Sequence, residues 1–132
     1  MLKDKATQYY QNGFSCSESI IKACIDENLC PDEFLPAATA FSAGMSSGCL
    51  CGAVAAAQMV SGYNFGRNNK FANPIVAREK AATLIGAFKE KNKVTCCRAL
   101  SSGLEGAARK EHCTKLVSDA AEILEELIKV KI

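Results

Sequence analysis

Apolar residues that recur at helical spacing constrain this chain most, because almost nothing in it alternates with the two-residue period of a strand. The clearest run lies near the end of the chain, where Asp119, Glu122, Glu125 and Glu126 occupy the opposite face. This pattern predicts an amphipathic helix that faces the core. Its predicted buried residues are Leu116, Val117, Ala120, Ala121, Ile123, Leu124, Leu127 and Ile128.

Capping and stop signals divide the rest of the chain into further helices. Ser15 and Glu18 form a capping box that starts a helix at Cys16, which Pro31 stops. Asn73-Pro74 starts another, which runs to about Lys91. Other predicted helices cover 2–11, 33–43 (ended by Gly44) and 51–61 (closed by Gly62), with a loop over 63–72 and a short helix through 96–100 capped by Thr95. We therefore expect an all-α fold, a compact single domain over residues 1–132 with about five main helices and a short one.

Size and cysteine content suggest an intracellular protein. A chain of 132 residues buries enough surface to fold without disulfides or metals. Its 8 cysteines are about 6% of residues, below the level of disulfide-stapled secreted domains. The opening MLKDKATQYYQNG lacks the apolar core of a secretory signal, and no run is long enough to span a membrane. The expected location is the cytoplasm, where cysteines more often serve metals or redox chemistry than structural disulfides.

The charge distribution gives no support for a nucleic-acid partner. The net charge is +2, the basic residues are scattered among acids, and Trp is absent. Phosphate binding needs clustered cations, and base stacking needs aromatic side chains. The sequence allows a homo-oligomer and does not identify a redox partner protein.

Four cysteines fall at or near the predicted start of a helix. Free backbone N–H groups and the helix dipole favour a thiolate at such positions, and can lower a thiol pKa from about 8.5 towards 3.5–7.5. Gly48 and Gly52 would let backbone N–H groups approach a charged sulfur. A phosphate-binding loop is the rival interpretation, but neither GxxxxGK[ST] nor GxGxxG is present. The four residues are Cys16, Cys51, Cys97 and Cys113.

No familiar thiol motif joins these cysteines. The chain has no CxxC, no CxxCH and no closely spaced ferredoxin run, so a shared site forms only where separate helices meet. A free cysteine is more often a small core residue than a ligand. We interpret Cys24 in that way and Cys30 as a helix-end residue, whereas Cys49 and Cys96 are spare ligands, resolving thiols or neither.

The polar residues near these cysteines also have two interpretations. His112, the single histidine, is a ligand or proton relay beside Cys113, or an exposed capping residue, and we favour the capping residue. Arg98 and Arg109 either offset the charge of a thiolate site or lie on the solvated surface, and we favour the surface.

Segments along nearly the whole chain resemble one bacterial family of small proteins. They are GFSCSESI, FSAGMSSGCLCGAVAAAQMVSG, CCRAL and HCTKLVSDAAEILEEL, and the family is C_GCAxxG_C_C, named for its cysteines and its suspected redox activity. The resemblance implies that the family cysteines are Cys16, Cys51, Cys97 and Cys113. One difference is Ala56, which stands where the family's central CGAxxG element has its last glycine.

The leading hypothesis is that these four cysteines bind an iron–sulfur cluster, of the two-iron type, for one-electron transfer. A structural zinc accepts the same four ligands. A second hypothesis is thiol–disulfide exchange through Cys51, resolved by Cys49 or Cys97. A third is a helical interaction module whose cysteines are only packed. The sequence names no substrate and does not decide whether the protein is an enzyme.

Overall fold

The computed structural model describes residues 1–129 and confirms the all-α fold class. Across this part of the chain the only β pairing is an isolated bridge between Leu50 and Cys96. None of the helices in residues 1–129 is both long enough and apolar enough to cross a membrane. The long helices are α1 (Leu2–Gln11), α2 (Cys16–Asp26), α4 (Gly52–Phe65), α5 (Ile75–Asn92) and α7 (Gly106–Lys129), and the short elements are α3 (Phe34–Thr39), the turn η1 (Gly44–Gly48) and α6 (Cys97–Leu100).

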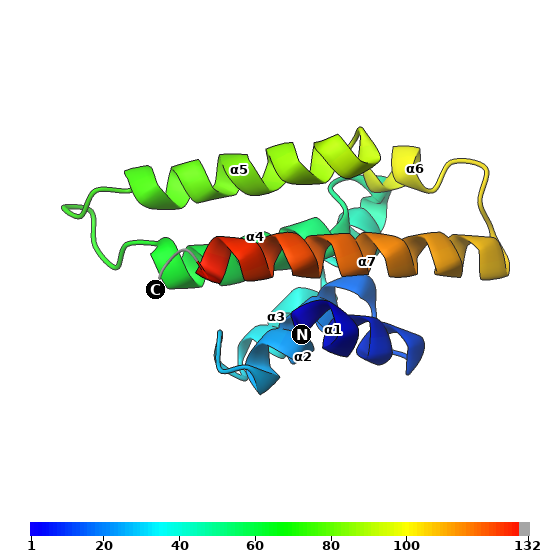
Figure 1. The fold of residues 1–132 in the computed structure, drawn as a ribbon, viewed down its shortest axis with the longest axis horizontal. Helices are drawn as coiled ribbons and strands as arrows, with labels where there is room; N and C mark the ends of the chain where they lie inside the picture. The colour runs from blue at the N-terminus through cyan, green and yellow to red at the C-terminus, as the bar shows by residue number, and fades with distance from the viewer. Residues whose placement is uncertain (130–132) are drawn as a thin grey trace.

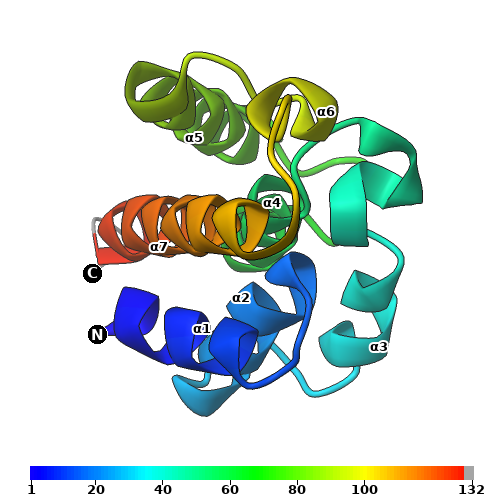
Figure 2. The same cartoon turned by 90° about the vertical axis from the view of Figure 1, so that its right-hand side faces the viewer.

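Helices α4 and α7 form the centre of the molecule. Figures 1 and 2 show α5 on one side of this pair and α1 to α3 on the other, and α4 packs against α2, α5 and α7. Helix α4 is buried on almost every side, from Gly52 to Ala57 and at Val60 and Ser61. Because most of these residues are small, neighbouring helices can approach it closely. A helix that is apolar all round belongs in the core.

Helix α7 supplies the largest share of the core. All eight residues predicted for its apolar face are buried. The helix is amphipathic, so its acidic face stays near solvent. Its partners are α1 and α2 on one side and α4 and α5 on the other.

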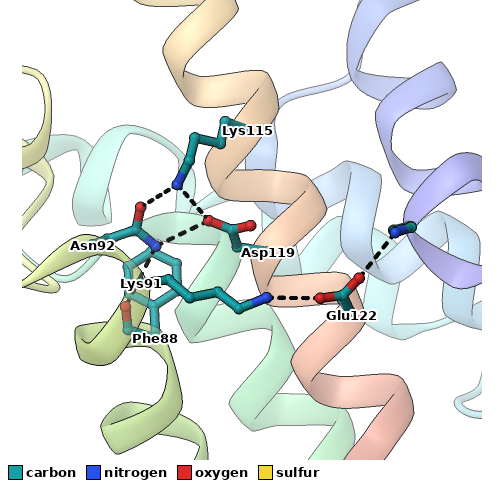
Figure 3. A network of polar contacts seen from close by, with 7 residues as sticks. Phe88, Lys91, Asn92, Lys115, Asp119 and Glu122 are labelled. Carbon is teal, nitrogen blue, oxygen red and sulfur yellow. Dashed lines mark hydrogen bonds and ion pairs between the residues drawn. The ribbon is translucent and has the colours of Figure 1, made fainter.

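Polar contacts tie α7 to α5 and α1 at the surface (Figure 3). Glu122 accepts hydrogen bonds from Lys91 of α5 at 2.7 Å and from Lys3 of α1 at 2.9 Å. Asp119 accepts one from the Asn92 side chain at 3.1 Å and one from Lys115 at 2.8 Å. These exposed pairs orient the helices but add little stability each.

Three helices, α3, α4 and α2, end elsewhere than the sequence predicts. The helix expected over 33–43 is limited to α3, Phe34–Thr39. Helix α4 continues through Gly62 to Phe65 and ends at Gly66. Asn64 explains the extension, because its side-chain amide donates to the carbonyl oxygens of Val60 and Leu29 and so fixes the last turn.

Helix α2 ends before Pro31, at Asp26. Asn28 adopts a left-handed conformation with φ of 60°. Its N–H bonds to the carbonyl of Ile25, and the N–H of Leu29 bonds to that of Cys24, which makes a Schellman motif. Cys30 therefore lies in the following turn, buried, and the expectation of a helix-end residue is wrong.

The starts of three helices also need correction. The N-cap of α6 is Cys96, so Thr95 lies one residue too early. Asn73 accepts a hydrogen bond from the N–H of Ile75, the first residue of α5, and Pro74 is the N-cap instead of the first helical residue. Helix α7 begins at Gly106, about two turns before Cys113.

Candidate functional site

The four family cysteines line one cavity of about 330 Å³. Each comes from a different helix or its N-cap: Cys16 from α2, Cys51 from α4, Cys97 from α6 and Cys113 from α7. The fold therefore brings together thiols that are distant in the sequence. The predicted convergence of the four residues on one pocket is present in the structure, whereas their predicted role as ligands stays a prediction.

Cys16 is the first residue of α2, where the predicted capping box is formed. The N–H of Glu18 donates to the Ser15 hydroxyl at 3.2 Å, and the N–H of Ser15 donates to the Glu18 carboxylate at 3.0 Å. The Cys16 sulfur lies against Gly52, where an added Cβ would come within 2.7 Å of it. The glycine after Cys51 thus makes room for another cysteine of the site, which differs from the expected role of exposing its own N–H.

Cys51 is the N-cap of α4 and is buried. Burial raises the pKa of its thiol to about 12, although the N–H groups of Val54 and Ala53 hydrogen-bond the sulfur and oppose this rise. Burial likewise raises the pKa of Cys16, against the N–H groups of Ala43 and Ser17. The expectation that helix starts lower the pKa of these two thiols is therefore wrong, because desolvation outweighs the N–H groups at the helix terminus.

An irregular segment, residues 43–51, lies between α3 and α4 and ends at Cys51, and we call it the strap. It begins with consecutive left-handed residues, Ala43 at φ 52°, Gly44 at 62°, Met45 at 63° and Ser46 at 55°. Such a run is unfavourable for L-residues, and strain of this kind is concentrated at functional sites. The N–H of Cys49 closes the turn by bonding to the carbonyl of Gly44 at 2.9 Å.

The strap is held by the segment that contains Cys97. The N–H of Cys51 donates to the carbonyl of Thr95 at 2.8 Å, and the N–H of Cys97 donates to that of Cys49. Gly44 allows this approach, because a Cβ there would lie 2.6 Å from the Cβ of Cys97. Two of the four cysteines are therefore fixed relative to each other by backbone hydrogen bonds.

Cys113 reaches the cavity from a half-buried turn of helix that follows an exposed stretch. It lies inside α7, so its predicted place at a helix start is wrong. The preceding residues 105–111 are exposed, which is why they carry no apolar periodicity that would have marked the true start. His112 is likewise inside the helix instead of capping it, and it lines a separate cavity with Lys91 and Lys93.

Tyr10 of α1 faces Cys113 in the cavity. Burial, followed by the neighbouring Cys113, raises the pKa of the Tyr10 hydroxyl. The Lys110 ammonium lies 3.6 Å from the centre of the Tyr10 ring and donates to the Tyr10 carbonyl at 2.9 Å. Nothing in the sequence indicated a contact between Tyr10 and the cysteines.

The cavity is positively charged. Arg109 and Lys110 line it, and none of its lining residues is Asp or Glu. Arg109 also lowers the pKa of Tyr10, against the larger effect of burial. Arg109 is exposed, as the favoured interpretation predicts, and it also lines the cavity, so the offset of thiolate charge stays a prediction.

The other cysteines lie outside the cavity. Cys24 is fully buried, and burial raises its pKa, which agrees with the structural role expected for it. Cys49 and Cys96 are exposed, and the Cys96 thiol donates to the carbonyl of Gly48 at 3.2 Å. All eight cysteines are free thiols in the structure.

The four sulfurs are not arranged around a single ion. A tetrahedral zinc site places its sulfurs within about 3.8 Å of one another, because each lies about 2.3 Å from the ion. Within residues 1–129, no three His, Cys, Asp or Glu side chains form a group that could hold a metal ion. Four cysteines are the ligands that an iron–sulfur cluster uses, and a cluster holds them through more than one iron atom instead of through a single ion.

These features define a class of protein: a helical bundle with four cysteines around one basic cavity. The family model described as "Putative redox-active protein (C_GCAxxG_C_C)" matches residues 14–127, and the chain belongs to this family. No curated protein and no solved structure matches the chain. The family description supports redox activity and names no cofactor.

Proposed function

We propose that this protein is a one-electron carrier that binds an iron–sulfur cluster through Cys16, Cys51, Cys97 and Cys113. The observation that carries the proposal is that these four residues, from four helices, line the same cavity. Four thiolates are the usual ligands of two-iron and four-iron clusters, and we favour the two-iron type. When bound, the cluster would supply the one-electron couple.

The surroundings of the cysteines support a negatively charged occupant. Arg109 and Lys110 line the cavity without a carboxylate, so they can offset the charge of thiolates. The N–H groups of Ala53 and Val54 point at Cys51, and hydrogen bonds to cluster sulfurs raise a reduction potential. The Gly52 position leaves space for the Cys16 sulfur.

The alternatives have less support from the same contacts. Thiol–disulfide exchange through Cys51 requires a thiolate without a metal to stabilise it, whereas burial raises the Cys51 pKa to about 12. A bound metal would instead displace the thiol proton. A zinc site requires three or four ligands around one ion, and within residues 1–129 no three His, Cys, Asp or Glu side chains form such a group. A module with merely packed cysteines leaves unexplained why four of them, from four helices, border the same cavity.

The test is anaerobic purification and reconstitution, followed by a visible spectrum and analysis of iron, sulfide and zinc. We expect a coloured protein with equal amounts of iron and sulfide, about two of each per chain for the two-iron type. Cys51→Ser and Cys97→Ser should each lower the iron content severalfold. Their matched controls are Cys49→Ser and Cys96→Ser, because these exposed neighbours lie outside the cavity.

Three results would reject the proposal. The first is a colourless, iron-free protein after reconstitution, and the second is stoichiometric zinc instead of iron. The third is equal iron loss in the cavity variants and the control variants. Faster alkylation of Cys51 than of Cys49 at pH 8 would favour thiol–disulfide exchange instead.

A further inference from the structure

We propose that a second cavity, beside the cysteine cavity, binds the oxyanion group of a small molecule, a carboxylate or a phosphate. This cavity has a volume of about 400 Å³ and lies between the strap, α6 and α7. Its polar lining consists of Ser46, Ser47, Arg98, Ser101 and Arg109, and Cys97 also lines it. The inference goes beyond electron transfer and does not depend on the identity of the redox cofactor.

The charge of the lining determines the ligand class. Two guanidinium groups and three hydroxyls face this cavity, and no acidic residue lines it. Guanidinium groups bind carboxylates and phosphates through paired N–H donors. The hydroxyls of Ser46 and Ser101 already donate to the carbonyls of Ser42 and Cys97, so the Ser47 hydroxyl is the one that adds a further donor. A volume of this size is within the range of small-molecule sites.

Both arginines have donors to offer. Arg98 donates one hydrogen bond to the carbonyl of Ser47 at 3.1 Å, which leaves most of the five donors of its guanidinium. Within residues 1–129, no hydrogen bond or ion pair involves the side chain of Arg109. Arg109 is exposed, so its guanidinium donors are open to solvent and available to a ligand.

The absence of a side chain at Gly48 leaves room for the side chain of Arg98. A Cβ at Gly48 would lie 3.1 Å from the Nε of Arg98, and φ there is +71°. The side chain of Arg98 thus packs over the backbone of the strap. The left-handed turn that precedes Gly48 places Ser46 and Ser47 on the same cavity.

The two cavities share part of their walls. Ala43, Cys97, Ser101 and Arg109 line both of them. An anion held by the arginines would therefore lie next to one of the four family cysteines. This location suits a substrate or effector whose charged group is anchored beside the redox site.

The test is an NMR titration of the ¹⁵N-labelled chain, reduced with dithiothreitol because that reductant is uncharged. Sodium phosphate and sodium acetate are titrated separately, at constant ionic strength set with sodium chloride so that screening does not change. We expect saturable shifts of the amides of Ser46, Ser47 and Gly48 with at least one of the two anions. The anion that binds identifies the phosphate or the carboxylate class.

Arg98→Gln and Arg109→Gln should each weaken this binding by about tenfold, the effect of losing one charge-assisted hydrogen bond. The matched control is Arg78→Gln, which removes the same charge from the exposed surface of α5, away from both cavities. If Arg98→Gln does not fold, Arg109→Gln decides, because the side chain of Arg109 holds no other part of the described structure.

Non-saturable shifts with both anions would overturn the proposal. Equal binding by Arg109→Gln and the unmodified chain would overturn it as well, as would equal weakening by Arg78→Gln. Absence of an iron–sulfur cluster in the protein would leave this titration unchanged, so failure of the proposed function and failure of this inference are distinguishable.

Discussion

Helix α7 and the strap border the same cavity but are built in opposite ways. Helix α7 (Gly106–Lys129) is regular and buries eight side chains, and it places Cys113 by helical geometry alone. The strap buries little and contains left-handed residues, and its position depends on backbone hydrogen bonds to residues 95–97. The comparison teaches that packing of the bundle provides the stability, whereas strained backbone positions two of the cysteines.

Removal of a core side chain from α7 tests whether packing of this helix provides the stability. Leu124 is fully buried, so Leu124→Ala should lower the free energy of unfolding by about 3 kcal/mol. The measurement is urea unfolding followed by circular dichroism. Glu126→Ala on the exposed face of the same helix is the control, with an expected change below about 0.5 kcal/mol. A loss below 1 kcal/mol for Leu124→Ala would contradict the assignment of stability to α7.

A methyl group at Gly52 tests the junction of strap and bundle. Its Cβ would lie 2.6 Å from the Phe41 carbonyl oxygen and 2.7 Å from the Cys16 sulfur. Gly52→Ala should therefore destabilise the fold by about 2 kcal/mol in the same urea experiment. Gly86→Ala on α5 is the matched control, since its Cβ meets nothing within 4 Å, and it should be neutral or stabilising. Equal effects of the two substitutions would refute the steric argument.

Ala43→Gly should change the free energy of unfolding in the opposite direction, because glycine relieves backbone strain at this position. Ala43 has a φ of 52°, which glycine adopts without penalty. After subtraction of the larger entropy of the unfolded chain, Ala43→Gly should stabilise the protein by about 0.5 kcal/mol. The identical change at Ala82, within α5, should destabilise it by about 1 kcal/mol. Thermal unfolding of both variants gives the comparison, and destabilisation by Ala43→Gly would show that the strap is not strained.

Low pH should weaken the contacts of α7 with α1 and α5 slightly, through protonation of the Glu122 carboxylate. Hydrogen bonds from Lys91 and Lys3 lower the pKa of Glu122 to about 2. A lowered folded-state pKa contributes stability above the unfolded value of 4.5, and this stability is lost as the pH falls towards 2. The difference in Tm between the unmodified chain and Glu122→Gln should therefore be largest near pH 6 and shrink below pH 4. A difference that does not depend on pH would contradict this assignment, and Glu126→Gln is the control for loss of an exposed charge.

The sequence predicted the regular parts of this molecule well, and the physical reason is that burial leaves a periodic pattern. The apolar face of α7 and the capping box at Ser15 were both identified residue by residue. The first turns of α7 were missed, because residues 105–111 are exposed and have no such pattern. These exposed turns are helical because they continue into the buried part of α7, and the local sequence does not show this.

The candidate site was predicted in part. The four cysteines were selected from helix starts and from the family resemblance, yet Cys113 does not start a helix. The strap was not predicted, because Ala43 and Met45 have no local preference for left-handed backbone. Tyr10, Lys110 and Arg109 reach the cavity through contacts between distant helices, and single-sequence patterns carry no information on such contacts.

The wall of the cysteine cavity is contributed by segments that run from Tyr10 to Leu116. During synthesis on the ribosome, the chain emerges from its N-terminus, so the pocket is incomplete until residues beyond Cys113 have left the exit tunnel. A ligand that needs all four sulfurs can therefore be loaded only after Cys113 has emerged, and its uptake would report that the helices bearing the four cysteines have come together.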